Sequence, residues 1–394
     1  MIAYNTEWLD ALKTSREAKQ WRASSIISDG QYAAIKAKFT TPLYTPNLFI
    51  RIALFIFSYI ALSGFSGMVF LFVTLIGERG LGVVGILVGI ALSVVLELLV
   101  KHRHLYKAGI DDALLYASLG FTIGGAVWLY LDMVAGTTLW VIPWLIAFPF
   151  LVWGVVRFTD RLVAAAAYIC VLGIVFTPLL EGGPVGKSIL PFSAMAVAII
   201  AYVLARKYKD QEPLHPYEDC LYIVELLALA TFYAAGNYYV VRELNQVLMN
   251  TTIAEGEDIP LAFLFYALTA LTPVAYIVRG LMIRDHLLLR TGLIAAVLSV
   301  LTFRYYFHVV PPEVALTVAG VVLFVLAIAA TRHLRTRRDG YTDKHLLHEK
   351  LKGLDAEALL VAHSLGASPQ VQPVEKKFEG GGGEFGGGGA GGGW

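Results

Sequence analysis

Five ionisable side chains interrupt stretches of sequence that are otherwise apolar, and they offer the most specific chemistry in the chain. They are Glu97, Glu225, Arg290, Asp132 and Arg304. If the apolar stretches lie in a bilayer, each charge is costly unless it pairs with another charge or faces water. Such residues therefore either hold helices together through ion pairs or mark a path for protons or solutes.

Glu225 and Arg290 lie at comparable depth in two of these stretches. Glu225 follows Asp219 by six residues, which is about 9 Å along a helix. Arg290 follows Asp285 by five residues, and the two aspartates begin their stretches on the same side. We expect an ion pair between Glu225 and Arg290 that joins two helices. The alternative is a substrate or proton site.

Two further arrangements of charge are possible. Glu97 lies one helical turn before Lys101, so we expect an ion pair between them that reaches the membrane surface. A second polar cluster could form near the opposite ends of the stretches, from Asp132, Arg304, His308 and Glu313. Neither spacing specifies a reaction.

Ten apolar stretches fill residues 48–331. The chain is 57% hydrophobic and only 15% charged, whereas soluble domains carry about 25% charged residues. A helix needs roughly 20 apolar residues to cross about 30 Å of hydrocarbon, and helices satisfy their own backbone groups there. We predict an all-α, polytopic membrane helix bundle of about ten transmembrane helices. The stretches are Ile52–Ile76, Leu81–Val100, Ala113–Val134, Thr138–Val156, Leu162–Leu180, Ile189–Ala205, Leu221–Ala235, Leu261–Val278, Leu287–Phe307 and Val314–Ala330.

Lysine and arginine fall almost entirely in alternate gaps between the stretches. Only Arg79, Lys187 and Arg242 lie in the other gaps, which carry acidic residues. Because positively charged loops remain in the cytoplasm, this asymmetry predicts that both termini are cytoplasmic. The longest gap on the external side, 237–259, has apolar residues at helical spacing, which predicts an interfacial or re-entrant helix.

An aspartate begins four of the stretches on the predicted cytoplasmic side. The four sites are Asp112-Ala-Leu, Asp160-Arg-Leu, Asp219-Cys-Leu and Asp285-His-Leu. A carboxylate at a helix start accepts hydrogen bonds from free backbone N–H groups and lies at the positive end of the helix dipole. We therefore expect these residues to cap helices. A repeated hairpin unit is the alternative.

Residues 1–47 are predicted to form a short helical segment in the cytoplasm. Ser28 and Gln31 have the spacing of a capping box, in which each side chain binds the backbone N–H of the other. A helix that begins there would place Tyr32, Ile35 and Phe39 on one face.

The same segment carries a recognisable pattern. Trp21 is followed by Ile26-Ile27-Ser28-Asp29-Gly30-Gln31 and then by Ile35. The pattern resembles the N-terminal segment of bacterial membrane proteins that carry domain of unknown function 2157, although Gly30 stands where that family usually has an acidic residue. The resemblance implies a multi-pass protein of the bacterial plasma (inner) membrane. It implies no activity.

The C-terminal part of the chain divides in two. Residues 332–367 are predicted to form a cytoplasmic juxtamembrane helix, and residues 368–394 are a Pro-rich and then Gly-rich tail. So much glycine cannot build a core, which predicts disorder. The tail resembles the Gly-rich, Trp-terminated ends of some TPM-domain membrane proteins. Phe378, Phe385 and Trp394 are candidates to bind a protein partner, and an inert tail is the alternative.

Three classes of function fit these features. We prefer a scaffold or regulatory protein that contacts the lipid bilayer and binds partners through its cytoplasmic ends and tail. A secondary transporter or channel for a small solute is the first alternative. A membrane enzyme is the least favoured, because His102 and His104 are two residues apart and do not share a helix face. With a net charge of +1 the chain gives no reason to expect a nucleic-acid partner, and no motif suggests a cofactor or metal.

Overall fold

The computed structural model describes residues 2–24, 26–76, 80–134, 139–209, 211–249, 258–306 and 328. Every regular element in this part of the chain is a helix. The chain divides into two compact units, and Ala11–Thr40 belongs to the second unit while the long helices belong to the first.

Nine helices of the described residues are long and apolar enough to cross a membrane, so the chain is a multi-pass membrane protein. They are α3 (Leu48–Ile76), α4 (Leu81–Arg103), α5 (Ile110–Met133), α6 (Val141–Phe158), α7 (Arg161–Glu181), α8 (Gly183–Lys209), α9 (Glu218–Gly236), α11 (Ala262–Met282) and α12 (His286–Tyr306). The first nine predicted stretches are thereby confirmed as helices. The tenth, Val314–Ala330, lies outside the described residues apart from Ile328.

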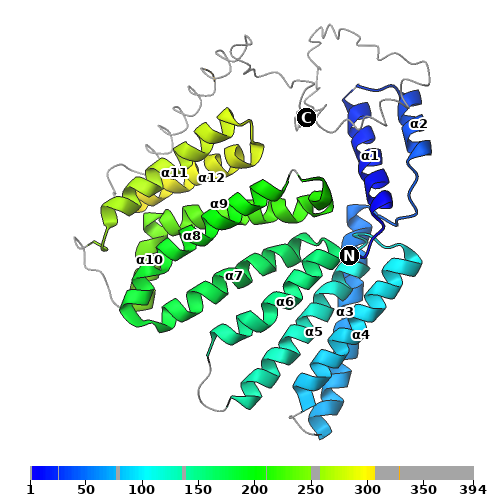
Figure 1. Ribbon diagram of the computed structural model, residues 1–394, viewed down its shortest axis with the longest axis horizontal. Helices are drawn as coiled ribbons and strands as arrows, with labels where there is room; N and C mark the ends of the chain where they lie inside the picture. Colours follow the sequence, from blue (N-terminus) through cyan, green and yellow to red (C-terminus); the bar gives the residue numbers. More distant parts are fainter. Residues whose placement is uncertain are drawn as a thin grey trace, which may run out of the picture. The chain divides into compact units, whose positions relative to one another are not determined.

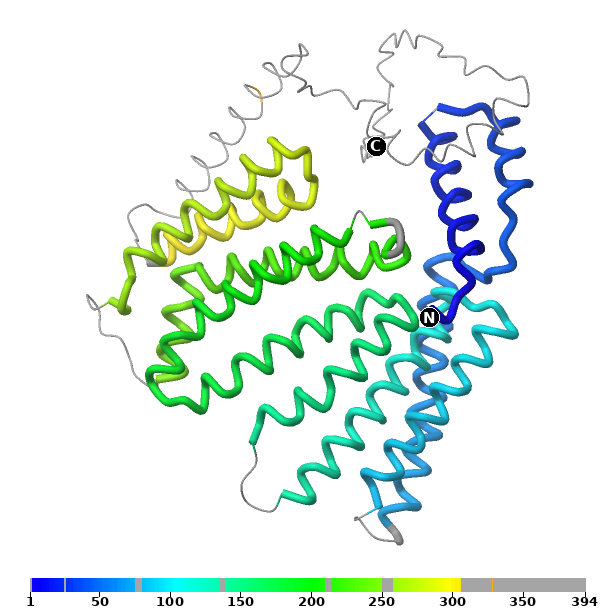
Figure 2. The backbone as a smooth tube through the Cα atoms, viewed as in Figure 1, coloured from blue at the N-terminus to red at the C-terminus, as the bar shows by residue number. Residues whose placement is uncertain are grey.

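Successive helices pair as antiparallel hairpins, α4 with α5, α6 with α7, α8 with α9 and α11 with α12 (Figure 1). In addition, α3 packs on α5, α7 contacts both α8 and α9, and α9 contacts both helices of the last pair. The path of the backbone alternates between two ends of these helices (Figure 2). We call the end that holds Lys107, Asp160, Asp219 and Asp285 the charged end.

Small residues set the spacing between α4 and α5. A Cβ added at Gly89 would lie 2.2 Å from Oγ1 of Thr122, and one added at Gly125 would lie 2.5 Å from the carbonyl oxygen of Gly82. Such close approach is the usual way for helices to gain van der Waals contact in lipid, where no hydrophobic force drives them together. The largest group of buried apolar residues adjoins this contact and comprises Leu92, Leu96, Val100, Leu114, Leu115, Leu119, Phe158 and Val163.

The helix predicted in the long external gap is α10 (Tyr238–Met249), which follows α9 at the end opposite the charged end. Its existence is confirmed. Residues 250–257 of the same gap lie outside the described part of the chain.

The N-terminal segment forms α1 (Thr6–Ala23) and α2 (Asp29–Lys38). The predicted capping box is confirmed, because the Ser28 N–H donates to Oε1 of Gln31 at 2.8 Å and the Gln31 N–H donates to Oγ of Ser28 at 3.3 Å. Ala18, Trp21 and Ile35 are buried and form a small core within the second unit. Trp21 and Ile35 therefore pack this pair of helices together.

Candidate functional site

Glu225 is fully buried and is held by two cations. Its Oε1 lies 3.1 Å from Nη1 of Arg206, and its Oε2 lies 3.0 Å from Nζ of Lys209. Arg206 also forms an ion pair with Asp285, the residue that precedes α12. One cluster therefore ties the charged ends of α8, α9 and α12 together, and both oxygens of the buried carboxylate are satisfied.

The predicted ion pair between Glu225 and Arg290 is wrong. Arg290 is exposed on α12, whereas the carboxylate of Glu225 is fully buried and is occupied by the two cations of α8. The two residues do lie at similar distances from the starts of their helices. Depth along a helix axis, however, does not fix the direction in which a side chain points around that axis.

Asp285 has two roles at the charged end. Its Oδ1 accepts hydrogen bonds from the backbone N–H of Leu287 at 2.8 Å and of Leu288 at 3.3 Å, so it caps α12 as predicted. Burial disfavours its charged form, but the hydrogen bonds from Arg206 and from the two backbone groups outweigh burial and lower its pKa. Asp160 caps α7 in the same manner, with Oδ1 2.9 Å from two backbone nitrogens.

The other two aspartates of the predicted set hold ion pairs instead of capping. Asp112 lies in the first turn of α5, and its Oδ2 is 2.7 Å from Nη2 of Arg51 on α3. Oδ2 of Asp219 lies 2.9 Å from Nζ of Lys107, and its Oδ1 lies 2.5 Å from Nη2 of Arg161. Their expected role as caps is therefore wrong for these two positions. Asp112 is the third residue of α5 and Asp219 is the second residue of α9, and from these positions a side chain can turn towards a neighbouring helix.

Glu97 pairs with a different helix from the one expected. Its Oε1 lies 2.8 Å from Nε of Arg157 at the end of α6. The expected ion pair with Lys101 on its own helix does not form. Because α4 and α6 both end at the charged end, Arg157 can reach Glu97 across the bundle. The pair joins two helices and adds to the ion pairs at this end.

The second predicted cluster is not assembled among the described residues. Asp132 is exposed at the end of α5, and no ion pair joins it to Arg304, which is partly buried on α12. His308 and Glu313 lie outside the described residues. Nη1 of Arg304 is buried without a hydrogen-bond partner in the described part of the chain.

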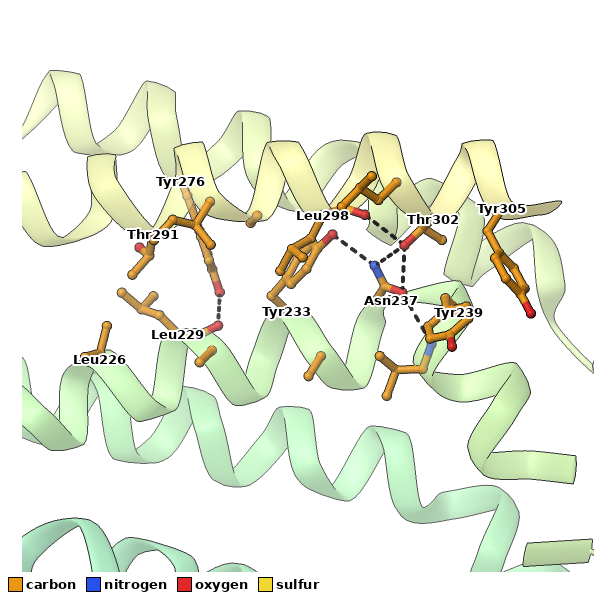
Figure 3. Close-up of a pocket in the computed structure, with 16 residues that line it drawn as sticks. Leu226, Leu229, Tyr233, Asn237, Tyr239, Tyr276, Thr291, Leu298, Thr302 and Tyr305 are labelled. Carbon is orange, nitrogen blue, oxygen red and sulfur yellow. Dashed lines mark hydrogen bonds between the residues drawn. The ribbon is translucent and has the colours of Figure 1, made fainter. Parts of the chain in front are cut away.

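A cavity of about 470 Å³ lies between α9, α11 and α12 (Figure 3). This volume falls within the range of about 300–1,000 Å³ that is usual for small-molecule sites. The cavity extends from the middle of α9 and α12 to their ends opposite the charged end. Its lining comprises Leu226, Leu229, Ala230, Tyr233, Ala234, Asn237, Tyr239, Val240, Tyr276, Thr291, Ile294, Ala295, Leu298, Leu301, Thr302 and Tyr305.

Asn237 organises the polar part of this lining. Its amide nitrogen donates to the hydroxyl of Tyr233 at 2.9 Å and to Oγ1 of Thr302 at 3.0 Å. Its Oδ1 accepts from the backbone N–H of Val240 at 3.3 Å, which caps α10. Figure 3 shows these groups on the wall of the cavity. The residue thus links α9, α10 and α12 with neutral hydrogen bonds.

Sequence reasoning missed this cavity. Two signals were present, namely an amide at the end of an apolar stretch and the alanines at positions 230, 234 and 295, which leave space on helix faces. Neither signal specifies which helices meet. The hollow exists because α9 packs incompletely against α12, which is distant from it in sequence, and periodicity along one helix does not report that.

The remaining predicted site residues, Phe378, Phe385 and Trp394, lie outside the described residues, as do the predicted segments 332–367 and 368–394. Among the described residues, no group of three or more His, Cys, Asp or Glu side chains is placed to hold a metal ion. No known protein family, curated protein or solved structure matches the chain.

Proposed function

We propose that this multi-pass membrane protein is a scaffold or regulatory protein that associates with other membrane proteins and with cytoplasmic partners. The observation that carries the proposal is the uncovered surface of α3. None of the 18 residues in its most apolar stretch is buried in the bundle. Such a helix is available for contact with another membrane protein.

The small residues of α3 support this proposal. Ser63 and Gly67 are both exposed and have the four-residue spacing that lets helices approach closely. A Cβ added at Gly64 or at Gly67 would meet no atom within 4 Å, whereas one added at Gly89 on α4 would collide with α5. The same kind of residue is thus packed in one helix and open in its neighbour.

The charged end is the cytoplasmic end in this proposal. The lysines and arginines gather there, and both termini would then lie in the cytoplasm of a bacterial cell, below its plasma membrane. Kinship with the domain of unknown function 2157 family is part of the same proposal. It is supported by the packing of Trp21 and Ile35 in the N-terminal unit.

A cross-linking experiment in intact membranes tests the role of α3. Gly64→Cys should give a discrete cross-linked adduct, because the backbone of a partner helix would lie close to position 64 of α3. Val297→Cys, on an exposed face of α12, is the matched control. Equal and weak cross-linking at both positions would show that α3 faces lipid alone and would contradict the proposal.

The tail is tested separately. Deletion of Phe378–Trp394 should leave membrane insertion intact and remove a partner from affinity purifications of the full chain, since exposed aromatic groups on a flexible segment are suited to peptide recognition. An unchanged set of partners would remove the tail from the proposal and leave the role of α3 standing.

A secondary transporter or channel is the second candidate, and the cavity between α9, α11 and α12 favours it. The ion pairs of Glu97 and Glu225 favour the scaffold, because these carboxylates join helices. Uptake assays with vesicles would separate the two. A saturable flux that is lost when the cavity is filled would establish transport.

A further inference from the structure

We propose that the cavity binds a neutral, single-tailed amphiphile from the bilayer, such as a fatty alcohol or a monoacylglycerol. The hydrocarbon tail would occupy the inner half, and an oxygen of the head group would accept a hydrogen bond from the hydroxyl of Tyr233. This proposal goes beyond the scaffold function and does not depend on it.

The shape of the cavity matches one hydrocarbon chain. Its lining on α12 runs from Thr291 to Tyr305, a distance of about 21 Å along the helix. A volume of about 470 Å³ over that length corresponds to a mean cross-section of about 22 Å². This cross-section admits one extended polymethylene chain, which would lie in a hollow that is open along part of its length. A transmembrane helix, which is about 10 Å across, is too wide to lie within this cross-section.

The lining is divided as an amphiphile requires. The walls of the inner half are formed mainly by Leu226, Leu229, Ile294 and Ala295. The two hydroxyls in this half, of Tyr276 and Thr291, already donate to backbone carbonyl oxygens. The outer half carries the polar groups, which are Tyr233, Asn237, Tyr239, Thr302 and Tyr305. A tail directed towards the middle of the bilayer and a head near its surface would match this order.

The absence of charge among the sixteen lining residues selects a neutral head group. Burying a carboxylate or a phosphate without a cation is costly. The cations at the charged end of these helices, Arg206 and Lys209, are already engaged with Glu225. A hydroxyl or ester head avoids this cost.

Tyr233 supplies a donor for that head. Its side chain is buried, with 7% of the residue exposed, and its oxygen accepts from Nδ2 of Asn237. The backbone N–H of Val240 fixes the orientation of the amide, because it binds Oδ1. The hydroxyl hydrogen of Tyr233 therefore has no acceptor among the described residues. Because a buried donor left unpaired is costly, an oxygen atom of a ligand would relieve that cost.

Photoaffinity labelling of the full chain in detergent tests the proposal. The probe is hexadecanol that carries a diazirine near the middle of its chain. We expect labelled peptides from α9 and α12, and at least tenfold less labelling in Ala230→Phe, whose ring would enter the cavity from an exposed position. Ala275→Phe, at an exposed position outside the lining, should label as the unmodified chain does.

Tyr233→Phe tests the head group separately, because it removes the hydroxyl and keeps the ring. Labelling by the alcohol should fall severalfold, while α9 and α12 remain the labelled helices. Three results would overturn the proposal: labelling spread evenly over lipid-exposed helices, unchanged labelling in Ala230→Phe, or stronger labelling by the corresponding diazirine fatty acid. If Ala230→Phe melts at the same temperature as the unmodified chain, loss of labelling reflects the blocked cavity. If its melting temperature falls, labelling is compared per folded molecule, and the same tenfold loss is expected.

Discussion

The two ends of α8, α9 and α12 solve the same packing problem in opposite ways. At the charged end, Arg206 joins Glu225 and Asp285, and Leu287 and Leu288 at the start of α12 are buried. At the other end, α9 and α12 are joined by the neutral hydrogen bonds of Asn237, and a cavity remains between them. α9 and α12 are therefore tied through ion pairs at one end, whereas at the other end they share only neutral hydrogen bonds and border a cavity.

This difference teaches where the bundle can tolerate change. A buried carboxylate requires both of its cations, so its surroundings allow one geometry. A neutral amide and hydroxyl cost less to rearrange, so the region around Asn237 can admit a guest. Stability should depend mainly on the charged end and ligand exchange mainly on the cavity.

The largest expected effect is at the charged end. Arg206→Ala should destabilise the protein by about 2–3 kcal/mol, because it removes one of the two cations of fully buried Glu225 and the partner of Asp285. Thermal melting in detergent measures the loss. Arg290→Ala removes an exposed arginine from the same helix bundle and should leave the melting temperature nearly unchanged. If the two variants melt together, the charged end does not hold the bundle.

A smaller effect is expected at the cavity. Asn237→Ala should cost about 1–2 kcal/mol, since it removes the cap of α10 and the hydrogen bonds to Tyr233 and Thr302. Tyr233→Phe removes one of these hydrogen bonds and should cost less. Melting curves of the two variants would show whether the effects follow that order. A loss as large as that of Arg206→Ala would erase the contrast between the ends.

Acid should weaken the charged end. The pKa of Asp285 is lowered in the folded chain, so its stabilising contribution is complete above its ordinary value of 3.8 and is lost as the pH falls through the lower folded value. The melting temperature measured from pH 7 downwards should fall in that acidic range. Asp285→Asn should reduce this dependence, and an identical pH profile in the variant would assign the acid sensitivity to other groups.

Much of the fold could be predicted because hydropathy along the chain determines which segments enter lipid. Nine predicted stretches match the nine long helices found among the described residues, and Ser28 with Gln31 predicted a capping box because that contact is local. The partners of Glu225 could not be predicted. They depend on how α9 is rotated about its axis relative to α8. The sequence gives the depth of Glu225 along the helix but not the direction in which its side chain points.

The cavity was beyond prediction for a related physical reason. It arises from the shortage of side-chain volume where Ala230 and Ala295 face each other's helices, and this requires knowing that α9 lies beside α12. This contact brings together residues that are distant in sequence. The polar residue at the edge of the cavity, Asn237, gave a local sign that something other than lipid adjoins the end of α9.

The smallest expected effect sharpens the comparison most. Leu298→Phe places a larger side chain into open space, because Leu298 lines the cavity and is 45% exposed, so the free energy of unfolding should change by less than about 1 kcal/mol. Leu288→Phe makes the same substitution on the same helix near the charged end, where the residue is 2% exposed, and should cost about 1–3 kcal/mol by overpacking. Melting of the two variants compares the ends directly. Equal losses would mean that the cavity is closed in the membrane-extracted protein, because only a filled space resists the added ring.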